Sequence, residues 1–219
     1  MLIRVLLADD HAIVREGLER ILKANNIEVV GQADNVSSAW ATYNELKPDV
    51  LVMDILMPGS TGIDGVRFIR KRAPDAKIVI FSIHENTQLI ERILSAGAYA
   101  YVAKSSDLMD IVKAIEMANK RKAYISSELA QSMVYSRLES TENVLSTLSE
   151  REFHIFCLVA EGNSIPEIAG KIFLAEKTVA NYLGLIKQKL KLKNLADIVR
   201  LAIQNNLIQI DGVTVVSKK

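Results

Sequence analysis

The chain has 219 residues, 49% of them hydrophobic and 24% charged, and carries a formal net charge of +1. This composition is typical of ordinary globular proteins and excludes a disordered or strongly basic chain, while the length favours two domains. No apolar run of about 18 residues occurs, and the first ten residues lack a basic region and a cleavage site. We therefore expect a cytoplasmic protein with no membrane partner. The single cysteine, Cys157, lies in an apolar run and is expected to be a buried thiol without a redox role.

Strand-like runs rich in β-branched residues alternate with amphipathic, helix-like stretches along the first half of the chain. The strand-like runs are Ile3–Ala8, Glu28–Gly31, Val50–Met53, Lys77–Ser82 and Ala98–Val102, and the helix-like stretches are Ile13–Leu22, Ser37–Leu46, Val66–Ile69, Gln88–Ser95 and Leu108–Met117. Because the connections are helical and the strands are nearly continuously apolar, the pattern predicts a five-stranded parallel sheet with helices on both faces. Right-handed crossovers then favour an α/β doubly wound fold for residues 1–122.

Polar residues stand at the carboxyl ends of four predicted strands, where ligands gather in parallel α/β sheets. Asp9 and Asp10 follow the first strand, Asp54 follows the third, Ser82 ends the fourth and Lys104 comes after the fifth. Three carboxylates brought together repel one another, and a hard divalent cation such as Mg²⁺ relieves that repulsion. Such a site suits phosphoryl transfer, with Asp54 as the nucleophile and Asp9 and Asp10 holding the metal. Lys104 would pair with the phosphoryl group, and Ser82 would hydrogen-bond one of its oxygens.

Each of these residues also has an ordinary structural explanation. Asp10 is suited to capping the first helix, Asp54 to starting a turn ahead of Pro58, and a lysine at a strand end is usually solvated. Complementary chemistry at four strand ends nevertheless favours the joint functional interpretation. Tyr101, close before Lys104, is expected to report occupancy of the site by moving between exposed and buried positions.

The segments LLADDH, DVLVMDILMPGSTGIDG, IVIFS and AGAYAYVAK resemble the receiver domain of bacterial response regulators, over about residues 1–122. The resemblance implies a flavodoxin-like fold in which Asp54 accepts phosphate from a sensor histidine kinase. It also implies that Asp9, Asp10, Asp54 and the main-chain carbonyl of Leu56 bind Mg²⁺. Tyr101 matches the aromatic switch position of these domains.

The chain departs from the commoner receiver pattern at three positions. Leu56 is apolar where many relatives carry a polar side chain, and Ile83 is bulky where many have a small one. Because both positions flank the route of a hydrolytic water, we expect a long-lived phosphoryl group. Ser105 replaces a proline that often follows the lysine, so a cis peptide is not implied there.

Helix-like patterns take over from about Ala123, apart from a short strand-like run at Val213–Val216. A linker is predicted at residues 123–145, with one helix at Ser126–Glu139, and a tail at residues 212–219. Ser149–Glu152 and Ser164–Glu167 match the capping-box pattern, in which serine and glutamate satisfy each other's backbone amides at a helix start. The sequence therefore predicts an all-α domain at residues 146–211.

Residues 146–208 resemble the helix-turn-helix domain of the NarL/LuxR/FixJ class of regulators. They contain the run LSEREFHIFCLVAEGNSIPEIAGKIFLAEKTVANYLGLIKQKLKL. Together with the receiver-like half, the chain looks most similar to the GacA/UvrY-like members of this class. The resemblance implies double-stranded DNA as a partner. It also suggests a homodimer formed on phosphorylation, because one short helix buries too little surface to hold a site alone.

A recognition helix is predicted at Thr178–Leu190. Its inward face comprises Val179, Leu183, Ile186 and Leu190, at helical spacing. The residues expected to contact DNA are Lys177, Thr178, Asn181, Tyr182, Gly184, Leu185, Gln188 and Lys191. Asparagine and glutamine can bond adenine in the major groove, and lysines contact phosphates. An ordinary solvated polar face is the alternative.

The recognition helix lacks features that relatives often have. Basic residues are frequent in relatives at the positions of Ala180, Gly184 and Leu185, and Ala175 stands where a capping residue is common. Gly184 costs about 1 kcal/mol of helix propensity, and the missing cap about the same. Residues 146–219 hold ten Lys/Arg against seven Asp/Glu, which is a weak basic excess. We therefore expect a DNA affinity that either is low for this class or depends strongly on dimerisation.

The favoured function is a phosphorylation-dependent DNA-binding transcriptional regulator. It is expected not to be an enzyme, beyond assisting its own phosphorylation and dephosphorylation. One alternative is a regulator that acts through protein partners, and another is a receiver that serves as a phosphate sink with weak DNA binding. His11, His84 and His154 show no metal-ligand spacing with Cys157, so surface or packing roles are expected for all three.

Overall fold

The computed structural model describes residues 2–57, 60–138, 144–205 and 207–208. The main division of the chain falls between Asn143 and Val144 and separates two compact units, each with its own buried core. The predicted tail at residues 212–219 and the end of the predicted helical domain at residues 209–211 lie outside the described residues.

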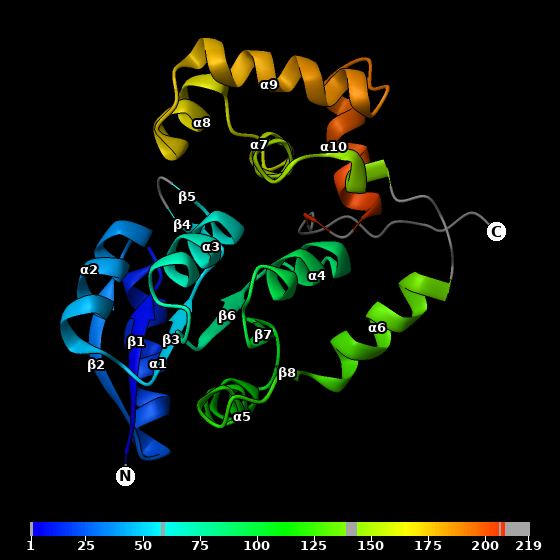
Figure 1. The fold of residues 1–219 in the computed structure, drawn as a ribbon. Coiled ribbons are helices and arrows are strands. Elements are labelled where there is room, and N and C mark those ends of the chain that lie inside the picture. Colours follow the sequence, from blue (N-terminus) through cyan, green and yellow to red (C-terminus); the bar gives the residue numbers. More distant parts are fainter. Residues whose placement is uncertain (1, 58–59, 139–143, 206, 209–219) are drawn as a thin grey trace. The chain divides into compact units, whose positions relative to one another are not determined.

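A parallel sheet of six strands forms the centre of the first unit (Figure 1). The strands lie in the order β2-β1-β3-β6-β7-β8, with bounds β1 Ile3–Ala8, β2 Ile27–Ala33, β3 Val50–Met53, β6 Ile78–Ser82, β7 Ala100–Ala103 and β8 Tyr124–Ile125. β3, β6 and β7 are buried along their whole length, because helices cover both faces of the sheet. This explains why these strands are almost entirely apolar in the sequence.

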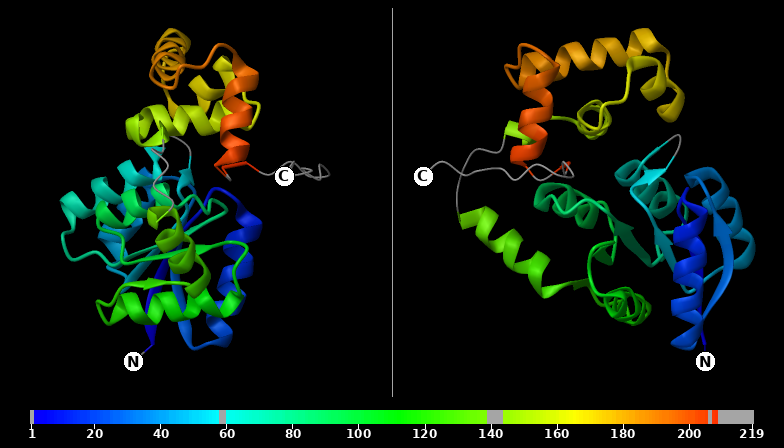
Figure 2. Two further views of the ribbon diagram at one scale, coloured as in Figure 1. Left: turned by 90° about the vertical axis from the view of Figure 1, so that its right-hand side faces the viewer. Right: turned by 180° about the vertical axis from the view of Figure 1, so that it is seen from behind.

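Two helices cover one face of the sheet, and three cover the other (Figure 1 and Figure 2). α1 (Ala12–Ala24) and α5 (Leu108–Asn119) share a core with β1 and β3, in which Leu22 and Ile115 pack with Val5 and Val52. The opposite face carries α2 (Val36–Leu46), α3 (Gly62–Arg72) and α4 (Thr87–Ser95). The predicted α/β doubly wound, flavodoxin-like fold is confirmed.

The sheet has one strand more than the five that were predicted. After α5 the chain turns at Arg121, whose φ is 56°, and Tyr124 donates its amide to the carbonyl of Tyr99 at 3.1 Å. β8 then pairs with β7, and Ile125 lies opposite Tyr101. A strand of two half-buried residues is too short to produce the apolar run or the alternation on which strand prediction depends.

A short antiparallel ribbon follows Asp54, formed by β4 (Leu56–Met57) and β5 (Ser60–Thr61). The sequence predicted only a turn near Pro58, which lies outside the described residues. Gly62, directly after the ribbon, packs against the backbone of Ile55. A Cβ atom at Gly62 would lie 2.5 Å from the Cα of Ile55, so glycine is required for this close approach.

The predicted linker helix corresponds to α6 (Ser127–Leu138), which contacts α4 in the first unit. Ser126 and Leu129 are buried where this helix begins. The amide of Leu129 donates to the hydroxyl of Ser126 at 3.4 Å. The start of the linker therefore packs as part of the first unit.

The second unit is helical in its described part. It contains a 3₁₀ turn η1 (Val144–Thr147), α7 (Glu150–Ala160), α8 (Ile165–Ile172), α9 (Glu176–Lys189) and α10 (Leu195–Gln204). The capping box at Ser149 and Glu152 is confirmed, with both reciprocal bonds present. At the start of α8, the amide and the hydroxyl of Ser164 both donate to the Glu167 carboxylate, at 2.7 and 2.6 Å. Cys157 is buried as expected, and burial raises the pKa of its thiol.

Candidate functional site

The carboxyl ends of β1 and β3 place two buried aspartates beside each other. The strands are neighbours, and the order of the sheet reverses at this point, where ligands bind in doubly wound folds. The amide of Asp54 donates to the carbonyl of Ala8 at 2.8 Å, and that of Asp9 to the carbonyl of Ala33 at 3.1 Å. Backbone pairing therefore continues past both strands and fixes the two aspartates. Asp9 is only 4% exposed and Asp54 only 6%.

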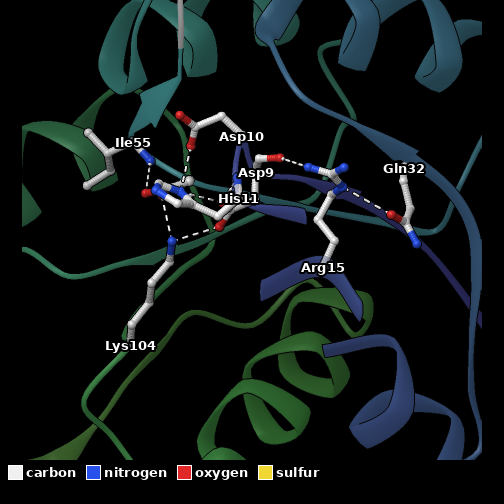
Figure 3. Close-up of polar contacts among 8 residues, drawn as sticks. Asp9, Asp10, His11, Arg15, Gln32, Ile55 and Lys104 are labelled. Carbon is white, nitrogen blue, oxygen red and sulfur yellow. Dashed lines mark hydrogen bonds and ion pairs between the residues drawn. The ribbon is translucent and has the colours of Figure 1, made fainter. Parts of the chain in front are cut away.

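Lys104 joins these two carboxylates. Its Nζ lies 2.7 Å from Oδ2 of Asp9 (Figure 3). The same Nζ lies 2.7 Å from Oδ2 of Asp54. Burial alone would lower the pKa of the Lys104 ammonium, but Asp54 and Asp9 outweigh that effect and the pKa is raised. Lys104 therefore stays charged and offsets part of the negative charge of the cluster.

Asp10 and His11 extend the cluster toward solvent. Nδ1 of His11 lies 2.8 Å from Oδ1 of Asp10 and 3.2 Å from Oδ1 of Asp9 (Figure 3). The N-cap of α1 is His11, without a side-chain capping bond, so the capping alternative for Asp10 is wrong. Ligand atoms of Asp9, Asp10, His11 and Asp54 all lie within 4.8 Å of one another. This spacing and the carboxylate donors fit a divalent cation.

His11 is the member of this cluster that the sequence analysis missed. Its side chain is exposed, which agrees with the expected surface placement, but the contact of its Nδ1 with the carboxylates of Asp9 and Asp10 was not predicted. The available signal was its position directly after Asp9 and Asp10, at the end of β1. His84 and His154, in contrast, are buried, which agrees with packing roles. Leu56 begins β4, but its side chain lies outside the described part, and its carbonyl as a metal ligand stays a prediction.

Ser82 and Tyr101 lie on the neighbouring strands β6 and β7. Both residues are fully buried, and the Ser82 hydroxyl lies near the Tyr101 hydroxyl without completing a hydrogen bond of good geometry among the described residues. A buried hydroxyl without a good hydrogen bond is costly, so it fits an acceptor that arrives with a ligand, such as a phosphoryl oxygen. Tyr101 donates its hydroxyl to the carbonyl of His84, and burial raises the pKa of that hydroxyl. Of the two positions expected for Tyr101, exposed and buried, the structure shows the buried one.

α9 presents the predicted two faces. Val179, Leu183, Ile186 and Leu190 are buried, which confirms the inward face. The residues proposed for DNA contact divide into exposed Lys177, Asn181, Gly184, Leu185, Gln188 and Lys191, and half-buried Thr178 and Tyr182. Ala175 occupies the N-cap without a side-chain bond, and the space beside Gly184 is open. The helix therefore begins without side-chain capping, as expected.

None of the helices in the described part of the chain combines the length and apolarity needed to cross a bilayer. Each of the two candidate sites lies in a unit with its own buried core. One site is a carboxylate cluster at a sheet edge, and the other is an exposed helix face. The first is suited to cation and phosphoryl chemistry. The second is suited to reading a groove of DNA.

Two family models match the chain. The model described as "Response regulator receiver domain" matches residues 5–116, which contain the whole carboxylate cluster. The model described as "Bacterial regulatory proteins, luxR family" matches residues 146–202, which include α7, α8 and α9.

Curated relatives match nearly the full length. Response regulator UvrY of Escherichia coli is 35% identical over 211 residues, which cover 94% of this chain and 96% of the relative. Response regulator GacA of Pseudomonas protegens is 34% identical over 209 residues, which cover 94% and 98%. The resemblance to GacA/UvrY-like proteins is confirmed.

Solved structures share the fold. A LuxR-family two-component response regulator from an Aurantimonas species is 37% identical, with a TM-score of 0.61, and the match covers 63% of this chain and 99% of that one. The response regulator RcsB of Salmonella typhimurium has a TM-score of 0.75 at 22% identity, and the match covers 94% of this chain and 98% of that one. At this lower identity the likeness shows the fold alone.

Proposed function

Because the chain is a bacterial response regulator, with a receiver domain and a luxR-family DNA-binding domain, we propose that phosphorylation of Asp54 controls the binding of DNA by α9. One observation carries this proposal. Asp54 is a buried carboxylate held 2.7 Å from the Lys104 ammonium, at the sheet edge where ligands gather. The arrangement supplies a nucleophile and a fixed cation for a phosphoryl group.

Asp54 supplies the attacking oxygen. A carboxylate oxygen bonds to the phosphorus of a phosphohistidine on a sensor histidine kinase, the P–N bond breaks, and its electron pair leaves on the imidazole nitrogen. The product is an acyl phosphate on Asp54. Mg²⁺ held by Asp9, Asp10, Asp54 and the Leu56 carbonyl supplies charge neutralisation for the phosphoryl oxygens when bound. Lys104, already beside Asp54, turns to a phosphoryl oxygen.

The buried pair behind the cluster transmits the change. The Ser82 hydroxyl, which completes no hydrogen bond of good geometry among the described residues, donates to a phosphoryl oxygen. Tyr101 lies on the neighbouring strand with its hydroxyl on the His84 carbonyl. Movement of Ser82 toward the phosphoryl group changes the packing around the Tyr101 ring, which then alters the surface of the receiver.

The output is DNA binding by a pair of chains in the cytoplasm. We propose that phosphorylated receivers form a homodimer, because α9 offers few cations and one copy makes too few contacts. Asn181 and Gln188 are exposed on α9 and suit adenine edges, while Lys177 and Lys191 suit phosphates. The chain turns over no other substrate in this proposal. Its only chemistry is its own phosphorylation and dephosphorylation.

The test begins with intact-mass measurement after incubation with acetyl phosphate and Mg²⁺. We expect one added phosphoryl group on the parent and none on Asp54→Asn. Gel mobility shifts with genomic fragments, with and without the phosphodonor, then measure the output. Labelling of Asp54→Asn equal to the parent would refute Asp54 as the acceptor. Labelling without any DNA shift would instead favour action through protein partners or as a phosphate sink.

A further inference from the structure

The carboxylate cluster contains an imidazole that the phosphoryl chemistry does not use. His11 directs Nδ1 toward the carboxylates of Asp9 and Asp10, at 3.2 and 2.8 Å (Figure 3). The amide of His11 also donates to Oδ1 of Asp9 at 2.8 Å. The same carboxylate oxygen thus anchors the backbone of His11 and faces its ring. The position of the imidazole is therefore fixed by the start of α1.

The two oxygens of Asp9 face different partners. Oδ2 pairs with Lys104 at 2.7 Å, whereas Oδ1 faces His11. Asp54 is divided in a similar way, since Oδ2 pairs with Lys104 and Oδ1 accepts the amide of Ile55 at 2.6 Å. The Lys104 ammonium consequently occupies one part of the cluster. The part formed by Asp9 Oδ1, Asp10 Oδ1 and His11 Nδ1 holds a nitrogen donor together with two carboxylate oxygens.

We propose that Nδ1 of His11 is a direct ligand of the divalent cation, so that the site prefers a first-row transition-metal ion to Mg²⁺. This inference rests on the metal site of the proposed function and deepens it. Imidazole suits transition metals, whereas Mg²⁺ selects oxygen ligands and keeps several waters. The mixed set of nitrogen and carboxylate donors therefore favours Co²⁺ or Mn²⁺ over Mg²⁺.

The other two histidines and the cysteine are poorly placed to compete for such an ion. The other two histidines, His84 and His154, are 4% and 7% exposed, and Cys157 is 3% exposed. The side chain of His11 is 64% exposed, although it contacts the cluster. An exposed imidazole next to carboxylates is thus found at one place in the described residues. A nitrogen signal from a bound metal can be assigned to His11 directly.

The experiment compares the parent, His11→Ala and Ile13→Ala, all without a histidine tag. Ile13 is an exposed residue of α1, so its variant controls for a change at the surface of the same helix. Dissociation constants for Co²⁺ and for Mg²⁺ are measured by calorimetry on each protein. Pulsed electron paramagnetic resonance of bound Mn²⁺ records whether ¹⁴N of an imidazole is coupled to the metal. Circular dichroism confirms that each variant is folded.

We expect His11→Ala to weaken Co²⁺ binding by at least about tenfold, the lower end of what losing even an outer partner of a ligand costs. Mg²⁺ binding should change little, because Mg²⁺ selects oxygen ligands and the carboxylates of Asp9, Asp10 and Asp54 remain. The ¹⁴N coupling should be present in the parent and in Ile13→Ala, and absent in His11→Ala.

A role of His11 as a simple ion-pair partner gives a different result. Both cations would then bind His11→Ala equally well or more tightly than the parent, with an unchanged ratio of Co²⁺ to Mg²⁺ affinity, and the proposal would be overturned. Absence of ¹⁴N coupling in the parent, or of Co²⁺ binding to it, would overturn it as well. Phosphorylation of Asp54 is measured separately by mass. If the parent takes up no phosphoryl group but shows ¹⁴N coupling to bound Mn²⁺, the proposed function is refuted and His11 is still a metal ligand.

Discussion

The carboxylate cluster of the receiver and the exposed face of α9 are positioned in different ways. The cluster side chains extend from strand ends or the residues that follow them, and they contact one another at 2.7 to 3.2 Å. The α9 face consists of separate exposed residues carried by one helix. Substitutions in the cluster should therefore lower the free energy of unfolding, and their effects on that free energy should not be additive. Substitutions on α9 should be nearly independent and should act on binding.

The largest effect on stability is expected for Lys104→Ala. Lys104 is 13% exposed and lies between two buried carboxylates, so its removal leaves their repulsion uncompensated. Breaking a buried pair in this way costs about 3 kcal/mol in the free energy of unfolding. Urea denaturation measures the loss in the parent and in an Asp54→Asn background, where it should be smaller. If Lys104→Ala lowers the free energy of unfolding equally in both backgrounds, Lys104 and Asp54 are not energetically coupled.

Gly62→Ala should be the next most damaging change. The new Cβ would lie 2.5 Å from the Ile55 backbone, which must shift, and we expect a loss of about 2 kcal/mol. Labelling by acetyl phosphate should also slow, because the Ile55 amide holds Oδ1 of Asp54. Gly17→Ala is the matched control, since nothing lies within 4 Å of a Cβ there and α1 should be stabilised. A Gly62→Ala protein as stable as the parent would contradict this account.

On the α9 side, Asn181→Ala should weaken DNA binding by about 1–3 kcal/mol without changing the stability of the protein. Lys191→Ala is a useful companion, because loss of one phosphate contact should reduce the slope of log affinity against log salt by about 0.9. Both are measured on phosphorylated protein by fluorescence anisotropy. If Asn181→Ala binds DNA as the parent does, this face of α9 does not read bases.

The smallest effect concerns the start of α9. Ala175→Ser supplies the missing cap and should stabilise the second unit by about 1 kcal/mol, with little change in DNA affinity. Gly184→Ala, where the space is open, should add a similar amount of stability. Gly184, however, lies on the exposed face, so its variant should also alter DNA affinity. Thermal unfolding and anisotropy together separate the two residues.

The sequence predicted those features that depend on long patterns or on one residue type at a strand end. The run that became β3 is continuously apolar because it is buried on both faces, and Asp54 follows this run directly. β8 and the β4–β5 ribbon were missed because two-residue strands carry no periodic signal. The contact of His11 with Asp9 and Asp10 depends on the direction of one side chain at the start of α1. Residue spacing alone does not determine that direction.

The pairing of β8 with β7 has a consequence for shorter versions of the protein. β7 would otherwise be the last strand of the sheet, and an open, apolar edge strand invites pairing with another chain. Two linker residues, Tyr124 and Ile125, cover that edge beside Ala100 and Tyr101. A receiver cut at residue 122 would lose this cover and present unpaired amides and carbonyls next to Tyr101. A receiver that extends through α6 keeps its edge closed, and it is the better form in which to study the domain free of aggregation.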